Sequence, residues 1–200
     1  TFPFLADHRF LSQPVAPLAL YLSLLVDAAK KTAASPQCRV TDLRLPNLPP
    51  IPKDQPGRVQ LKMQSVEGGA RTFQILSQLA PETNGSGKST LHASGHLGTG
   101  NHSVLPTWAK ECADFAKVQA RCQREEGGDE FYRCLDTLGV QLGPSFRKIQ
   151  AVWIGKDEAL GHISAAGGQN HENDATVHPT LLDAALQLAA GLAAGGSETT

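Results

Sequence analysis

Apolar residues recur at helical spacing in two stretches of this chain, one near each end. From Leu18 to Ala29 they fall every third or fourth residue and form one apolar face, and Pro17 stands at the first turn, where a proline is tolerated. A second apolar stretch runs from Pro179 to about residue 192. This periodicity predicts a helix over each stretch.

Between the two predicted helices the hydrophobic pattern changes to that of β-strands. Apolar and polar residues alternate around Leu61, which is typical of a strand with one buried face. Glycine-rich segments between the alternating stretches are typical of tight turns. The pattern predicts three strands of an antiparallel meander, over residues 58–66, 71–79 and 89–97.

A second and shorter set of elements follows the meander. The sequence predicts a helix over residues 130–138, ended by Gly139, and a hairpin of two strands over residues 146–154 and 158–163. Strands and helices do not alternate regularly along the chain, which argues against a doubly wound parallel sheet. We therefore expect an α+β fold in which a long apolar helix lies against an antiparallel sheet, twice over.

The predicted elements divide the chain into three segments. Residues 1–98 hold the first helix and its sheet, residues 99–128 form a polar linker with some helix, and residues 129–200 begin the second helix-and-sheet unit. Few residues follow the second helix, so we expect this second unit to be incomplete.

Composition excludes several classes of function. The chain has 18 Lys and Arg against 19 Asp and Glu, with a formal net charge of −1 and no basic cluster, so we expect no nucleic-acid binding. No apolar run approaches the roughly 20 residues of a membrane span, and the first residues do not resemble a signal peptide. We therefore expect a cytoplasmic protein without membrane attachment. The four cysteines are too widely spaced for a zinc site and are expected to be reduced thiols.

Two side chains near opposite ends of the chain are candidates for acid–base chemistry. His8 precedes the first predicted helix, and a neutral imidazole can accept a proton near physiological pH. Asp183 lies in the second predicted helix, where an apolar environment would keep a carboxyl protonated and able to donate. Gln187 follows on the same helical face and can hydrogen-bond that carboxyl. We expect His178 to help begin this helix. A base and an acid of this kind can together eliminate water.

Four motifs resemble those of the dehydratase domains of modular polyketide synthases and related fatty acid synthases. Residues 8–17 resemble the HxxxGxxxxP motif, and residues 91–95 resemble the strand that ends the family's first half. Residues 142–146 resemble its tyrosine-glycine-x-x-phenylalanine segment, and residues 178–187 carry its DxxxQ motif. All four occur in the family's order.

This resemblance implies a double hot-dog fold, in which each half is an antiparallel sheet wrapped round a central helix, with the second hot-dog incomplete in this chain. It implies that His8 removes the α-proton and that Asp183 protonates the β-hydroxyl, in a syn elimination that converts a 3-hydroxyacyl thioester into a 2-enoyl thioester. It further implies a substrate carried on the phosphopantetheine of an acyl carrier protein, with no metal or organic cofactor. The implied partners are that carrier protein, neighbouring synthase domains and a second copy of the chain.

The resemblance also implies five substrate-binding residues. Backbone N–H groups around Ser12 and Gly143 would polarise the thioester carbonyl, and Phe146 would shape the substrate tunnel. Pro17 closes the first motif, and Gln187 would orient the catalytic carboxyl.

Three positions depart from the family pattern. Ser12 stands in place of the motif glycine, Leu18 in place of the glycine after Pro17, and Leu142 in place of the tyrosine. Loss of the motif glycine is shared with dehydratase-like domains that close oxygen heterocycles or shift double bonds, so a cyclase or a double-bond isomerase stays open as an alternative. An inactive scaffold domain stays open as well. The cyclase-like and isomerase-like domains often lack the aspartate as well, and its presence here as Asp183 favours dehydration.

Overall fold

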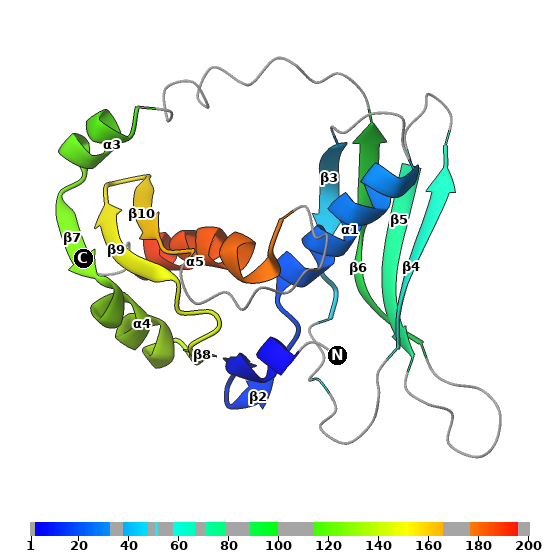
Figure 1. Ribbon diagram of the computed structural model, residues 1–200, viewed down its shortest axis with the longest axis horizontal. Coiled ribbons are helices and arrows are strands. Elements are labelled where there is room, and N and C mark those ends of the chain that lie inside the picture. The colour runs from blue at the N-terminus through cyan, green and yellow to red at the C-terminus, as the bar shows by residue number, and fades with distance from the viewer. Residues whose placement is uncertain are drawn as a thin grey trace. The chain divides into compact units, whose positions relative to one another are not determined.

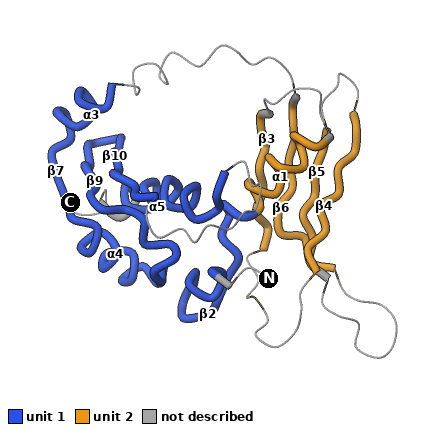
Figure 2. Tube along the Cα trace, in the orientation of Figure 1, with its two compact units in different colours: residues 1–20, 104–200 blue, residues 21–103 orange. Residues whose placement is uncertain are grey.

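The computed structural model describes most of the chain, as residues 3–32, 38–47, 51, 58–66, 71–78, 89–99, 114–165 and 177–195. The chain splits into two compact units (Figure 2): unit 1 comprises residues 1–20 and 104–200, and unit 2 comprises residues 21–103. The sequence predicts boundaries at residues 98 and 128 instead. The first 20 residues group with the C-terminal part because their strands pair there, a long-range contact that local patterns do not report.

Unit 2 is built on a four-stranded antiparallel sheet, in the order β3-β6-β5-β4. Its strands are β3 (Cys38–Arg44), β4 (Arg58–Ser65), β5 (Arg71–Gln78) and β6 (Ser89–Thr99). The last three are the predicted meander, with ends that differ by one or two residues. β3 is an additional edge strand, which the sequence pattern did not indicate.

The helix α1 (Leu18–Thr32) lies against one face of this sheet (Figure 1). Leu25 in α1 and Phe73 and Ile75 in β5 are fully buried, whereas Gln74 between the last two is exposed. The alternation that predicts the strand therefore also identifies which of its faces is covered.

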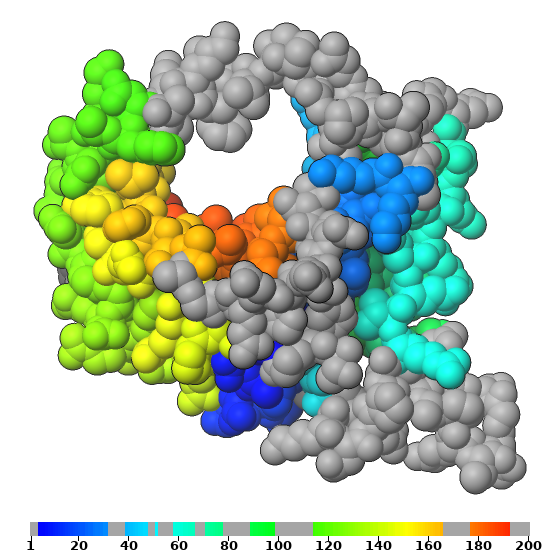
Figure 3. All heavy atoms as spheres, in the orientation of Figure 1, coloured from blue at the N-terminus to red at the C-terminus, as the bar shows by residue number. Residues whose placement is uncertain are grey.

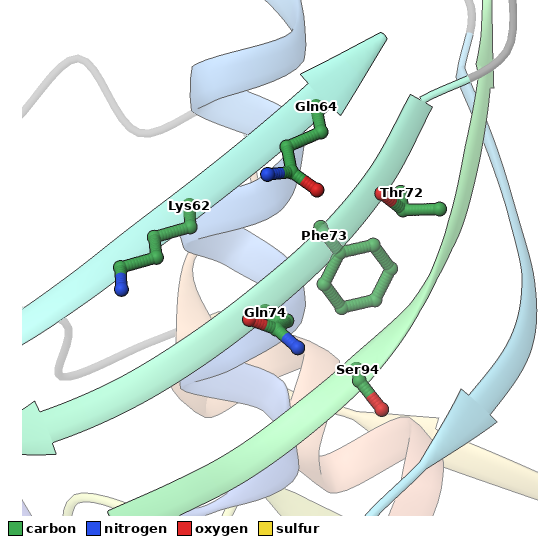
Figure 4. A pocket seen from close by; sticks show the side chains of 6 residues that line it. All are labelled: Lys62, Gln64, Thr72, Phe73, Gln74 and Ser94. Carbon is green, nitrogen blue, oxygen red and sulfur yellow. The ribbon is translucent and has the colours of Figure 1, made fainter. Parts of the chain in front are cut away.

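The other face of the sheet is polar. A shallow depression of about 300 Å³ lies on it (Figure 4), and its lining residues come from three neighbouring strands: Lys62, Gln64, Thr72, Phe73, Gln74 and Ser94. Lys62 pairs with Gln74, and Gln74 pairs with Ser94, so these side chains are cross-strand neighbours. None of the candidate site residues belongs to this depression.

Unit 1 contains a three-stranded antiparallel sheet, in the order β10-β9-β7, with helices against it. The strands are β7 (Arg124–Gly127), β9 (Ile149–Ile154) and β10 (Ala159–Ile163), and the helices are α3 (Phe115–Arg121), α4 (Gly128–Thr137) and α5 (Pro179–Gly195). The core of unit 1 is formed by Phe131, Tyr132, Leu135, Leu142, Phe146, Ile149, Val152, Ile154 and Ala184. Among the described residues, no helix is both long enough and apolar enough to cross a bilayer.

The segment predicted as a linker contains regular structure in its described part. Asp114 caps α3, because its carboxylate accepts a hydrogen bond of 3.2 Å from the N–H of Lys117. β7 carries Glu125 and Glu126, so no apolar alternation marks it as a strand, and it is formed by pairing with β9. The sequence analysis expected some helix in this segment, as found in α3, but it did not expect the strand β7.

A second, smaller sheet holds the N-terminal motif of unit 1. Its order is β2-β1-β8, with β1 (His8–Phe10), β2 (Gln13–Pro14) and β8 (Val140–Leu142), and the 3₁₀-helix η1 (Pro3–Asp7) leads into it. The predicted strand over 146–154 begins only at Ile149, because the residues before it form a turn. The pairing of β1 with β8 thus joins the N-terminal segment to the middle of the C-terminal half of the chain.

Candidate active site

His8 is the first residue of β1, and its ring is fixed by the strand that follows the hairpin turn. Its Nδ1 atom lies 3.0 Å from the carbonyl oxygen of Val15, and the N–H of Val15 donates to the carbonyl of His8, also at 3.0 Å. A carbonyl oxygen can only accept a hydrogen bond, so Nδ1 carries the proton of the neutral ring. The other nitrogen, Nε2, then has a free lone pair and is the basic atom.

Asp183 lies in the first turns of α5 and is 6% exposed. Its Oδ2 atom accepts a hydrogen bond of 2.7 Å from the Nε2 atom of Gln187, one turn later, as the spacing of the two residues predicts. Burial raises the pKa of the Asp183 carboxyl above its ordinary value, against the opposing effects of the Gln187 hydrogen bond and of His8. The direction of this shift is the one that an acid catalyst requires.

The structure brings these two side chains together. Nε2 of His8 and Oδ1 of Asp183 are 3.9 Å apart, and the two side chains are 16% and 8% exposed. This separation is longer than a hydrogen bond, so the atoms face one another without being paired. Because the amide of Gln187 occupies Oδ2, the proton of a neutral Asp183 belongs on Oδ1. A basic nitrogen and an acidic oxygen therefore point at the same space.

Phe146 connects both candidate catalytic residues. Its ring packs edge-on against the imidazole of His8, with centroids 5.1 Å apart. Its carbonyl accepts hydrogen bonds of 3.3 Å from the Gln187 amide and from the hydroxyl of Tyr132. The sequence predicts Phe146 and Gln187 as site residues, and the structure places both beside the pair. Tyr132 was not predicted, because nothing near it in the sequence is a candidate catalytic group.

Gly143 lies near the pair but does not have the predicted role. Its N–H already donates to the carbonyl of Asp7, at 2.7 Å, so it is not available to polarise a substrate carbonyl. A Cβ atom at position 143 would lie 2.5 Å from Cγ of Asp7. The physical reason for a glycine here is this close approach, which a sequence motif alone does not reveal.

Asp7 is a residue of the site region that the sequence prediction missed. Its Oδ2 atom accepts hydrogen bonds from the Oγ of Ser145 at 2.6 Å and from the N–H of Ser145 at 3.1 Å. The available signal was a single acidic residue that follows the apolar residues 4–6 and directly precedes the candidate base.

Ser12 lies in the two-residue turn between β1 and β2, outside the buried pair. The φ angles of Leu11 and Ser12 are 47° and 68°, which is the left-handed backbone of a type I′ hairpin. Both side chains are exposed, and the space-filling view shows the hairpin at the surface of unit 1 (Figure 3). A glycine, which the similar motif has at this position, adopts this left-handed backbone without strain. The side chain of Ser12 is exposed to solvent and does not face the acid–base pair.

Pro17 and His178 each start a helix. Pro17 is fully buried, and its carbonyl accepts a hydrogen bond of 3.1 Å from the N–H of Leu20 in the first turn of α1. His178 accepts a hydrogen bond of 3.3 Å at Nδ1 from the N–H of Thr180, which caps α5, as the sequence predicts. The second contact stabilises the start of α5, the helix that carries Asp183 and Gln187.

Metal-binding and thiol chemistry add little to this picture. Within the part of the chain that the structure describes, no three His, Cys, Asp or Glu side chains cluster so as to hold a metal ion. Cys122 and Cys134 are free thiols, and the side chains of Cys38 and Cys112 lie outside the described residues.

Two family models match the chain. One, described as the polyketide synthase dehydratase domain, matches residues 1–78, and the other, described as the polyketide synthase dehydratase N-terminal domain, matches residues 112–200. Together the two matches include every residue of the candidate site.

Known synthases and solved dehydratase structures are similar over nearly the whole chain. Polyketide synthase PksN of Bacillus subtilis (strain 168) is 24% identical over 94% of this chain, which corresponds to 3% of that protein. An inactive variant of the CurJ dehydratase, with a histidine replaced by phenylalanine, is 30% identical with a TM-score of 0.78, over 96% of this chain and 63% of that one. An inactive variant of the CurK dehydratase, with an aspartate replaced by asparagine, is 25% identical with a TM-score of 0.82, over 99% of this chain and 68% of that one.

The double hot-dog fold predicted from the sequence is confirmed by these structural matches, together with the antiparallel sheet and helix found in each unit. The chain spans about two thirds of the solved dehydratase chains and a few per cent of the curated synthase. This share is consistent with a second hot-dog that is present only in part.

Proposed function

The chain belongs to the polyketide synthase dehydratase family, and we propose that it eliminates water from a 3-hydroxyacyl thioester to give a 2-enoyl thioester, a hydro-lyase reaction. The observation that carries this proposal is the pair formed by Nε2 of His8 and Oδ1 of Asp183, 3.9 Å apart in a largely buried setting. One atom is a base and the other an acid, and both face the same space.

The reaction follows from the protons that these atoms hold. Nε2 of His8 takes the α-proton, which the neighbouring thioester carbonyl makes acidic, and the electron pair left on the α-carbon forms the double bond as the β-carbon–oxygen bond breaks. Oδ1 of Asp183 gives its proton to the departing hydroxyl, which leaves as water. The protein is left with a protonated His8 and an ionised Asp183, and a proton transfer between them restores the starting state. Because both groups act from one side, the elimination is syn.

Gln187 and Phe146 prepare the pair for this chemistry. Gln187 holds the carboxyl by Oδ2 and leaves the proton on Oδ1, and the ring of Phe146 packs against His8.

The substrate class and the partners are part of the same proposal. We expect the acyl chain to be carried on the phosphopantetheine of an acyl carrier protein, within a cytoplasmic synthase that also supplies neighbouring domains and a second copy of the chain. The similarity to PksN supports this setting. We also propose that the first hot-dog ends at residue 98 and that the second begins after residue 128. The reaction as written uses two side chains and takes no step through a metal or an organic cofactor.

Two relatives support the roles of the pair. The CurJ variant that lost a histidine and the CurK variant that lost an aspartate are both inactive. His8 and Asp183 are the residues of these two types that face one another in this chain.

The test uses the chain with carrier protein loaded with the 3R or the 3S 3-hydroxyacyl group, read by intact mass spectrometry. We expect one epimer to lose one water, and we expect His8→Ala and Asp183→Asn to abolish that loss. The exposed residues His162 and Asp157 provide matched controls, as His162→Ala and Asp157→Asn, which should keep full turnover. Ring closure and double-bond shift are tested separately on a 2-enoyl carrier-protein substrate, with a free hydroxyl in the chain for ring closure, since both conserve its mass and change only the retention time. Turnover in either pair variant would contradict the assignment.

A further inference from the structure

Asp7 joins two segments that lie far apart in the sequence. Its carboxylate accepts hydrogen bonds of 2.6 Å and 3.1 Å from the hydroxyl and the N–H of Ser145, 138 residues away. Its own carbonyl accepts a third, of 2.7 Å, from the N–H of Gly143. Three hydrogen bonds from residues 143–145 to one residue make this a firm attachment.

The segment that Asp7 holds leads directly to the acid–base pair. Residues 143–146 form a tight turn, closed by a hydrogen bond of 3.0 Å from the N–H of Phe146 to the carbonyl of Gly143. At the end of the turn, the Phe146 ring packs against His8, and the Phe146 carbonyl accepts from the amide of Gln187. That amide in turn holds Asp183. The turn therefore touches the base directly and the acid through one intermediate residue.

The packing leaves this turn little freedom to shift while Asp7 is in place. A Cβ atom on Gly143 would lie 2.5 Å from Cγ of Asp7, so the backbone of the turn rests directly against the carboxylate group. Asp7 is also the residue before His8 in the chain, so one residue fixes the turn and adjoins the base.

We propose that Asp7 is a positioning residue for the reaction proposed above, and the inference rests on that proposed function. Asp7 holds the turn at residues 143–146. The turn places the ring of Phe146 against His8 and the carbonyl of Phe146 within hydrogen-bond distance of the Gln187 amide. It does not touch the reacting atoms. Without it, the two side chains remain present, but their spacing is no longer fixed, and small displacements of catalytic groups cost much of the rate.

The first readout does not depend on turnover. The Phe146 ring lies edge-on to the imidazole of His8. We expect its ring current to shift the NMR resonances of the His8 ring protons. We expect Asp7→Ala to move these resonances toward the values of an unstructured histidine. Asp7→Asn should keep them, because an amide oxygen can accept both bonds from Ser145. Ser145→Ala removes only the hydroxyl bond and should give an intermediate shift.

The second readout is the kinetics of water loss from the 3-hydroxyacyl carrier-protein substrate. Asp7→Ala should lower kcat about 10- to 100-fold with little change in KM, and Asp7→Asn should restore most of kcat. The exposed Asp157 serves as the control, since Asp157→Ala should leave both readouts unchanged.

The outcomes separate the two proposals. Unchanged His8 resonances and unchanged kcat in Asp7→Ala would overturn the positioning role. If Asp7→Ala does not fold, the resonances of Ser145→Ala decide, and an unaltered His8 spectrum there counts against the role. If the unmodified chain loses no water from either epimer, the proposed function fails, while the His8 resonances still decide whether Asp7 positions the turn.

Discussion

Replacing Ser12 by glycine is expected to stabilise the chain. Ser12 is the second residue of the turn between β1 and β2, and its φ of 68° lies in the left-handed region. A side chain is strained there, because Cβ comes too close to the following carbonyl oxygen, whereas glycine has no Cβ. The substitution removes this strain and keeps the turn.

The size of the effect follows from two opposing contributions. The left-handed conformation costs an ordinary residue roughly 1–2 kcal/mol, and glycine gives up about 0.5–1 kcal/mol more backbone entropy on folding. Ser12 is exposed, so no core packing is lost. The net stabilisation is therefore about 0.5–1 kcal/mol, which corresponds to a rise in Tm of roughly 1–4 °C for a chain of this size.

Thermal and urea unfolding of three variants would measure it. Ser12→Gly should be more stable than the unmodified chain, and Ser12→Ala should differ from it by less than about 0.5 kcal/mol, because alanine keeps the strain. Gly139→Ala should act in the opposite direction, since Gly139 has a φ of 82° and its Cβ would lie 2.7 Å from Cδ2 of Leu11. If Ser12→Gly were no more stable than Ser12→Ala, the argument from left-handed strain would be refuted.

Three further predictions concern buried groups. Burial raises the pKa of Asp183, so the stability that its neutral form contributes is lost as the pH rises through that pKa. Asp183→Asn should therefore stabilise the chain more at about pH 8 than at about pH 4. The prediction is contradicted if the variant shifts the urea midpoint by the same amount at both pH values. Burial lowers the pKa of His92, so the stability that its neutral form contributes is present above about pH 6.5 and is lost as the pH falls. His92→Phe should therefore reduce the loss of unfolding free energy on acidification. An unchanged dependence of unfolding free energy on pH below about 6.5 would count against this. Gly128→Ala should cost about 2 kcal/mol or more in urea unfolding, because its Cβ would lie 2.3 Å from the carbonyl oxygen of Ile149, whereas Gly127→Ala, with nothing within 4 Å, should cost much less.

The helix α4 and the hairpin β9–β10 were predicted correctly within three residues at most of their ends. The other correctly predicted elements are those with a strong local period. The helices at α1 and α5 and the strands β4, β5 and β6 each show a regular apolar pattern over eight residues or more. β1 and β8 have three residues each and β2 has two, so no period can appear in them. β1 and β2 form a local hairpin, whereas β1 and β8 pair between residues more than 100 positions apart, which is a tertiary contact.

The candidate site shows the same division. Asp183 and Gln187 are one helical turn apart, so their hydrogen bond was predictable from their spacing. The role of Gly143 was predicted wrongly, since its N–H is bonded to Asp7. Asp7 itself was missed, because its partner Ser145 is 138 residues away and no local pattern connects them.

The sequence by itself therefore determined the two apolar helices, the meander, the candidate base and acid, and the family of the chain, since each of these is carried by residue types at short spacing. Only the tertiary structure decided that Nε2 of His8 and Oδ1 of Asp183 face each other at 3.9 Å, that Val15 fixes the tautomer of the base, and that burial raises the pKa of the acid. The reason is physical: distances, proton positions and desolvation depend on groups that meet only when distant strands and helices pack.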